Sequence, residues 1–275
     1  VPFPFFLANG WDALNLYRVA SFIGIALWFM SLIPAILLKA EAQGDEKMPT
    51  EKRSLRQSIV HPDRVFKLTL VESLIAFGAA FVIPLFSVYF HDSALHAHDE
   101  QIGGVFAIGS LALSFAALAS PLVAQRMGKV RSVFALRMLS VPFVVILAFA
   151  PHTDIHYIAS FLSNVGTALS LATLAYVGRT VLYNMSTPIF SAFSMEQLDP
   201  GERGATIGIQ AAVASLAAAI GGYFGGQWMA LHDFQTPLLL MAGLYFTSTM
   251  LFWLFFRGVE QPAPQMATAA ASAGR

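Results

Sequence analysis

Long apolar runs without charged residues constrain this chain more than any other feature. A helix that spans a bilayer needs about 20 mostly apolar residues and tolerates few charges. Four runs meet that requirement: 19–38, 102–125, 204–232 and 234–256. A fifth run, 73–90, is slightly short, but it gains a turn if Lys67 and Glu72 lie at the interface, where long side chains snorkel. The pattern predicts an all-α integral membrane protein.

Composition supports this prediction and excludes several classes of function. Hydrophobic residues make up 56% of the 275 residues and charged residues 12%, whereas soluble domains carry about a quarter charged residues. The net charge is zero and no basic stripe is present, so we expect no nucleic-acid partner. The chain has no cysteine, which excludes disulfides, thiolate zinc sites and thiol nucleophiles.

Basic residues are distributed unevenly, which predicts the orientation by the positive-inside rule. The connections at 91–101, 151–157 and 231–236 contain no lysine or arginine, and we expect them outside. The N-terminus then lies outside and the C-terminus in the cytoplasm, across a plasma (inner) membrane. We expect these residues to be cytoplasmic: Lys39, Lys47, Lys52, Arg53, Arg56, Arg64, Lys67, Arg126, Lys129, Arg131, Arg137, Arg203 and Arg257.

This orientation requires an even number of spans between Arg131 and Arg203. We place one at 133–150 and the other from about 174 to 195, which leaves 158–173 as an outer extension or an in-plane helix. The prediction is seven helices in four regions. They are an extension with a single helix (1–38), a basic cytoplasmic linker (39–65), a six-helix bundle (66–257) and a disordered tail (258–275).

Three segments contain motifs that are typical of membrane helix connections. The first joins the third and fourth spans and reads Gln125-Arg126-Met127-Gly128-Lys129-Val130-Arg131. The second precedes the sixth span and reads Leu198-Asp199-Pro200-Gly201-Glu202-Arg203-Gly204-Ala205-Thr206-Ile207-Gly208. The third, 80–90, carries Pro84 inside an apolar run.

A six-helix group behind a long basic loop resembles the second half of a major facilitator superfamily (MFS) transporter, and the three segments are similar to motifs of that family. The first segment departs from the family motif at two positions. Gln125 stands where the motif has its Asp, and Pro121, four residues before the segment, stands where the motif has its first Gly. The resemblance covers about 66–257, with 19–38 as the family's sixth helix. It implies a conformational latch of Arg126, Gly128, Lys129 and Arg203, a helix kink at Pro84, and close helix packing at Gly204 and Gly208.

Charged residues inside a span are costly and are candidates for function by default. Two lie away from the predicted loops, Glu72 and Arg179. Arg179 lies about 24 Å from Met195 along a straight helix, so it either snorkels at the outer interface or faces a cavity and contacts an anion. Glu72 either forms an interfacial salt bridge or takes part in proton coupling, and we favour the former.

Polar residues near Arg179 extend the candidate substrate or coupling site to Tyr176, Asn184 and Ser186, and Pro188 would free a backbone carbonyl. The alternative is that these side chains join packed helices. Gly221 and Gly225, with Gly222 and Gly226, form two Gly-x-x-x-Gly pairs that favour close helix packing. Side chains of the types that bind transition metals gather in one predicted outer loop, which contains His91, Asp92, His96, His98 and Asp99. A short polar loop explains these residues equally well, and we predict no metal site.

The sequence thus predicts a secondary transporter that moves a small solute by alternating access. An exporter is one interpretation, and the sequence leaves the direction open between import and export. Its partners would be the bilayer, a small-molecule substrate and a missing N-terminal half, since the chain begins Val-Pro-Phe-Pro-Phe without a methionine. We expect no cofactor and no enzymatic activity, because no catalytic set is present. The alternative is a seven-helix receptor or photosensor, although the last span has no lysine for a retinal Schiff base.

Overall fold

The structure is a computed structural model that describes residues 59–93, 95–152 and 167–259, together with eight helical residues between 18 and 30. It divides into two compact units, Val1–Arg53 and Ser54–Arg275. In the first unit only those eight residues are described, and seven of them fall within the predicted span 19–38. Most of the predicted linker and nearly all of the predicted tail lie outside the described residues.

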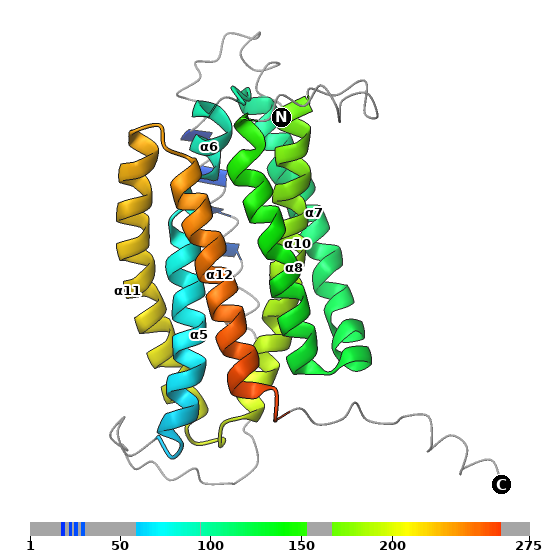
Figure 1. Cartoon of the computed structure of the whole chain (residues 1–275), viewed down its shortest axis with the longest axis vertical. Coiled ribbons are helices and arrows are strands. Elements are labelled where there is room, and N and C mark those ends of the chain that lie inside the picture. Colours follow the sequence, from blue (N-terminus) through cyan, green and yellow to red (C-terminus); the bar gives the residue numbers. More distant parts are fainter. Residues whose placement is uncertain are drawn as a thin grey trace, which may run out of the picture. The chain divides into compact units, whose positions relative to one another are not determined.

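The second unit is a bundle of long helices, and no strand occurs among its described residues (Figure 1). Successive long helices run in alternate directions. Five segments are long and apolar enough to cross a membrane: Pro62–Asp92, Asp99–Met127, Lys129–Phe149, Arg203–Ala230 and Gln235–Phe256. The predicted all-α integral membrane fold is therefore confirmed. The elements are α5 (Pro62–Ala80), η1 (Ile83–Leu85), α6 (Phe86–Asp92), α7 (Asp99–Met127), α8 (Lys129–Phe149), η2 (Ala150–His152), α10 (Thr167–Glu196), α11 (Arg203–Ala230) and α12 (Gln235–Phe256).

Two helices begin earlier than the sequence predicted. Because α5 begins at Pro62, Arg64 and Lys67 lie in its first turns instead of a loop. The described part of α10 begins at Thr167, so 167–173 belongs to the same helix as 174–195. Of the two alternatives, an extension of the span that begins near 174 and an in-plane helix, the structure agrees with the extension for these seven residues. The physical reason is that no proline interrupts the sequence between Thr167 and Pro188, so the helical hydrogen bonds continue. Residues 158–166 lie outside the described part.

The helices pack as neighbours in the order α7, α10, α8, α12, α5 and α11. At the last of these interfaces, glycines bring two backbones together. A Cβ at Gly221 would lie 2.5 Å from the Phe77 carbonyl oxygen, and one at Gly225 would lie 2.2 Å from that of Phe81. By contrast, a Cβ at Gly226 would meet nothing within 4 Å. The first Gly-x-x-x-Gly pair therefore lies at the α5–α11 contact.

The other predicted packing positions differ from this pair. A Cβ at Gly204 or Gly208 would meet nothing within 4 Å in the described bundle, so neither glycine permits a close approach there. Pro84 lies in η1, between α5 and α6, where Val82 leaves helical geometry with φ −131°. Pro188 lies inside α10, which continues through it to Glu196.

The core consists of two apolar clusters that are separated along the helix axes. The sequence order on each helix places the clusters on opposite sides of a polar layer at mid-height, which we call the mid-bundle layer. It contains Glu72, Arg137, Arg179, Tyr183, Ser186 and Tyr245. The first cluster includes Ile75, Val144, Ala175 and Leu238. The second includes Leu68, Val133, Phe190 and Phe252.

Candidate functional site

Arg137 is the most deeply buried charged side chain of the mid-bundle layer, with 1% of its surface exposed. It lies eight residues after the start of α8 at Lys129, which corresponds to about 12 Å along the helix axis. The prediction that Arg137 belongs to the basic loop before this span was wrong. Its position inside the predicted span 133–150 was the signal that could have identified it as a third intramembrane charge.

The contacts of Arg137 join three helices. Its Nη2 lies 3.3 Å from Oε2 of Glu72 on α5, and its Nε donates to Oγ of Ser186 on α10 at 3.3 Å. The guanidinium carbon lies 4.5 Å from the centre of the Phe190 ring and 5.6 Å from that of Tyr183, within the range of cation–π attraction. The remaining nitrogen, Nη1, is buried and has no hydrogen-bond partner among the described residues.

Arg179 forms the second cationic centre and is 3% exposed. Its Nη2 donates to the Tyr245 hydroxyl on α12 at 2.6 Å. Its guanidinium carbon lies 5.2 Å from the centre of the Tyr183 ring and 5.5 Å from that of Tyr245. Its Nε is buried without a hydrogen-bond partner in the described part of the chain. This geometry favours an interior role over a snorkelling one, because the guanidinium does not reach the surface of the bundle.

Of the five substrate or coupling candidates predicted from sequence, the structure brings three together. Glu72, Arg179 and Ser186 all lie in the mid-bundle layer. Asn184 instead donates back to the Thr180 carbonyl of its own helix at 2.8 Å. Tyr176 packs edge-on against aromatic rings of α6 and α7, which are Phe86, Phe90 and Phe106.

Sequence reasoning did not identify Tyr183 and Tyr245 as residues of the site. Their ring centres are 5.3 Å apart, and both rings lie close to the Arg179 guanidinium. Tyrosines are common in apolar helices, and only the packing of α10 against α8 and of α8 against α12 brings these two together.

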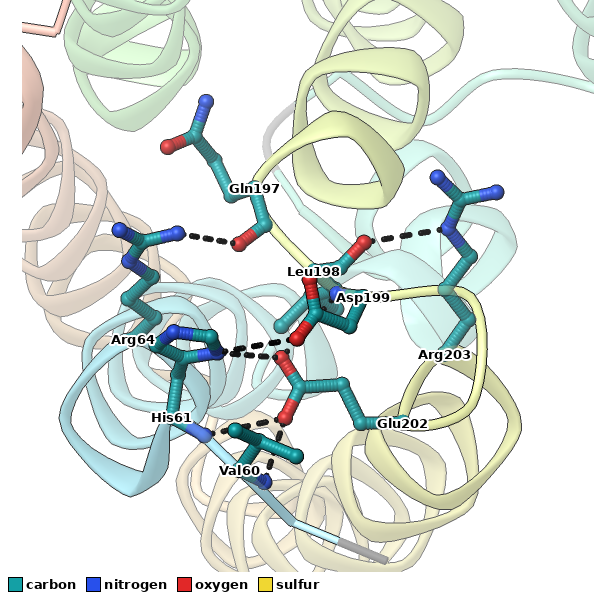
Figure 2. Close-up of polar contacts among 8 residues, drawn as sticks. All are labelled: Val60, His61, Arg64, Gln197, Leu198, Asp199, Glu202 and Arg203. Carbon is teal, nitrogen blue, oxygen red and sulfur yellow. Dashed lines mark hydrogen bonds and ion pairs between the residues drawn. The ribbon is translucent and has the colours of Figure 1, made fainter.

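A second group of polar contacts joins the start of α5 to the connection between α10 and α11, at the lower end of Figure 1. We call this group the end clasp, and Figure 2 shows it. Its centre is the buried carboxylate of Glu202. Oε2 accepts hydrogen bonds from the backbone N–H groups of Val60 and His61, and Oε1 accepts one from Asp199. The residues of the end clasp are Val60, His61, Arg64, Gln197, Leu198, Asp199, Glu202 and Arg203.

The end clasp satisfies backbone groups that helix ends leave unpaired. Glu202 accepts from the N–H groups that precede α5. Arg64 Nη1 donates to the Gln197 carbonyl at 3.0 Å, and Arg203 Nε donates to the Leu198 carbonyl at 3.3 Å, just beyond the end of α10. Burial alone would raise the pKa of the Glu202 carboxyl, but the backbone N–H groups that it accepts from hold this pKa below its ordinary value. The carboxylate is therefore charged at neutral pH.

Side-chain ligand atoms of His61, Asp199 and Glu202 lie within 4.8 Å of one another, close enough to hold a metal ion. However, His61 Nδ1 lies 3.2 Å from Oε1 of Glu202, and both oxygens of that carboxylate already accept backbone hydrogen bonds. The arrangement fits a helix-end clasp better than a metal site. The histidines that the sequence predicts on the outer side have other contacts: His98 caps α7 with Gln101, while His91 contacts the neighbouring Asp92.

The residues predicted as a latch lie at the same end of the bundle. Gly128 separates α7 from α8 at φ 81°, a backbone conformation that favours glycine. Lys129, the first residue of α8, pairs with Glu196 at the end of α10. Arg126 is exposed near the end of α7. The structure thus places Lys129 and Arg203 at the two ends of the α10–α11 connection, and Arg126 near the end of α7.

Comparison with known proteins gives a structural likeness without a close relative. The sequence matches no protein-family profile and no curated protein. Among solved structures, the chain is similar to the POT family transporter PepTSo, whose crystal structure was determined in meso, with a TM-score of 0.52 and 18% sequence identity. The similarity covers 74% of this chain and 39% of that chain, so this chain spans well under half the length of the transporter. The likeness concerns the fold: the bundle shares its helical architecture with part of that solved structure.

Proposed function

We propose that this chain is part of a secondary active transporter of the MFS type, which moves a small solute by alternating access. The observation that carries the proposal is the mid-bundle layer, where Glu72, Arg137 and Arg179 are held inside a membrane bundle between two apolar clusters. Charges at this depth are costly, and in membrane proteins they mark solute and ion pathways. Sites of secondary transporters lie near the bilayer midplane.

The fold likeness supports the proposal, because the mid-bundle layer lies in a bundle with the architecture of a solved transporter. A receptor or photosensor is not favoured, since nothing in the comparison points to one and α12 has no lysine. We propose that an N-terminal bundle completes the transporter, in agreement with the 39% coverage of the solved chain.

We further propose that the end clasp and the Lys129–Glu196 pair lie on the cytoplasmic side, as the basic residues predict. Movement of the α5 start relative to the α10–α11 connection would break the hydrogen bonds of Glu202. The end clasp would therefore stabilise the state in which this side of the bundle is closed.

Thiol labelling in the cysteine-free background tests alternating access and orientation together. Single variants Ser186→Cys, His96→Cys and Lys129→Cys are made in the full-length protein, and an impermeant maleimide is applied to sealed vesicles of either orientation. Ser186→Cys should react from both sides, because each state opens the mid-bundle layer to one side. His96→Cys should react only from outside and Lys129→Cys only from the cytoplasm. Reaction of Ser186→Cys from one side alone would refute alternating access.

A further inference from the structure

The mid-bundle layer has an imbalance of charge. Arg137 and Arg179 both place a cation in the membrane interior, and each is at least nine-tenths buried. Within the described helices, Glu72 is the one acidic side chain that lies away from the helix ends. It pairs with Arg137 at 3.3 Å and is 29% exposed. With both arginines and Glu72 charged, the layer carries one uncompensated positive charge.

The two arginines also have unused hydrogen-bond donors. Arg137 uses Nε and Nη2, and Arg179 uses Nη2. Arg137 Nη1 and Arg179 Nε are both buried and have no partner among the described residues. A buried guanidinium N–H without an acceptor is strongly unfavourable, because its desolvation is not offset by a hydrogen bond. Each cationic centre therefore offers at least one nitrogen donor to an acceptor that the described residues do not supply.

An anion would supply both the missing negative charge and the missing acceptors. Its charge balances that of the layer, and its lone pairs accept hydrogen bonds from the free N–H groups. Arginine donors match the oxygen atoms of carboxylates particularly well. The two guanidinium carbons lie 5.6 and 5.2 Å from the centre of the same Tyr183 ring, so the site is lined by aromatic surface. Such a lining suits an organic body better than a strongly hydrated inorganic ion.

We propose that the mid-bundle layer binds a small organic monoanion through its carboxylate, with Arg137 and Arg179 as the recognising cations. This inference rests on the proposed transport function and names the substrate class of the same site. Glu72 sets the valence of the ligand, because it neutralises one of the two arginines. A solute with one negative charge then makes the occupied layer neutral, which is the state with the lowest electrostatic cost in an apolar environment.

Thermal unfolding of the purified chain in lipid nanodiscs tests the proposal without any assay of transport. The probes are acetate, butyrate and benzoate at constant ionic strength, each compared with its neutral amide and with chloride. At least one carboxylate should raise the melting temperature by about 5 °C at a hundredfold excess over its Kd. Its amide and chloride should not. A chloride effect equal to that of the carboxylates would overturn the organic class of ligand.

Substitutions of single residues test whether the carboxylate binds at the mid-bundle layer. Arg179→Gln should weaken carboxylate binding at least about tenfold, because it removes a charge-assisted hydrogen bond and the uncompensated charge. Arg257→Gln, which removes an exposed arginine at the end of α12, is the matched control and should change binding less than about twofold. Equal binding by wild type and Arg179→Gln would refute the assignment. Glu72→Gln supplies a second test, because the layer then carries two positive charges and should prefer phthalate, a dianion, over benzoate.

The two experiments fail independently. If no carboxylate binds while Ser186→Cys is labelled from both sides, the anion site is wrong and the transporter proposal stands. If carboxylates bind and depend on Arg179 while labelling occurs from one side only, the binding site stands and alternating access fails. A Glu72→Gln variant that keeps the wild-type preference for benzoate would refute the role of that carboxylate in setting the ligand's charge.

Discussion

Replacing Gly225 by alanine should open the contact between α5 and α11. The added Cβ would lie 2.2 Å from the carbonyl oxygen of Phe81 and 2.7 Å from its Cα. Carbon and oxygen atoms in contact are normally about 3.3–3.6 Å apart, so the two helices have to separate by about 1 Å. Both atoms belong to the backbone, and no side-chain rotation relieves the clash. The contact therefore loses packing along its length.

The size of this loss follows from the depth of the atomic contacts. A gap of about 0.5–1 Å removes a quarter to a half of each contact energy of about 0.1–0.2 kcal/mol. For roughly 40 atom pairs, the number that one buried leucine makes, the loss is about 1–4 kcal/mol. The same substitution in a free helix would be stabilising, because alanine has a helix propensity about 1 kcal/mol better than glycine. A loss of stability in Gly225→Ala therefore indicates that Gly225 lies against α5, whereas a gain would indicate that it faces open space.

Tryptophan fluorescence during unfolding by denaturing detergent measures this effect, and Trp228 is one of the four tryptophans that contribute to the signal. Trp228 lies on α11, and its ring centre is 5.6 Å from that of Phe81, at the same contact. Gly225→Ala should lower the stability of the purified chain. Gly226→Ala, where the new Cβ would meet nothing within 4 Å, is the matched control and should leave stability equal or higher. Equal losses in the two variants would show that the α5–α11 contact is not as close as described.

Three further predictions concern other parts of the bundle. Arg137→Gln should lower the stability of the purified chain by about 3 kcal/mol in the same unfolding assay. This value is at the low end for a broken buried ion pair, because Glu72 is partly exposed. Adding Glu72→Gln should restore part of the loss. Gly128→Ala should cost about 2 kcal/mol, because φ 81° with ψ 162° is accessible almost only to glycine; an unchanged stability curve would contradict this geometry. The lowered pKa of Glu202 means that the folded state binds this proton less readily than the unfolded chain. Its stabilising effect is complete above the ordinary glutamate pKa of about 4.3 and is lost as the pH falls through and below that value, so Glu202→Gln should show a shallower acid slope in melting temperature between about pH 6 and pH 3.

The membrane fold could be predicted from the sequence because its cause is local. Each helix must present about 20 residues of apolar surface to lipid and satisfy its own backbone hydrogen bonds, and both requirements are visible in one continuous segment. The runs 102–125, 204–232 and 234–256 accordingly match α7, α11 and α12 within a few residues. The start of α10 was misjudged, because an apolar segment looks alike whether it continues a span or lies outside it.

The candidate site depended on tertiary structure, because its residues come from four helices that are far apart in sequence. Arg179 and Glu72 could be selected individually, since an isolated charge in an apolar run is conspicuous. Arg137 was assigned to a basic loop, because its distance from Lys129 and Arg131 carries no information about where the helix enters the membrane. Only the packing of α8 against α10 and α12 shows that it shares the Tyr183 ring with Arg179.

The sequence by itself determined that this chain forms apolar membrane helices and which charges are costly within them. Tertiary structure decided which of these charges meet, which donors remain free and which glycines permit contact. Gly221 and Gly204 lie in similar small-residue patterns, yet only Gly221 lies against another backbone in the described bundle. The reason is physical: helix formation depends on hydrogen bonds within a segment, whereas the balance of charge and the closeness of packing depend on the neighbours that the fold supplies.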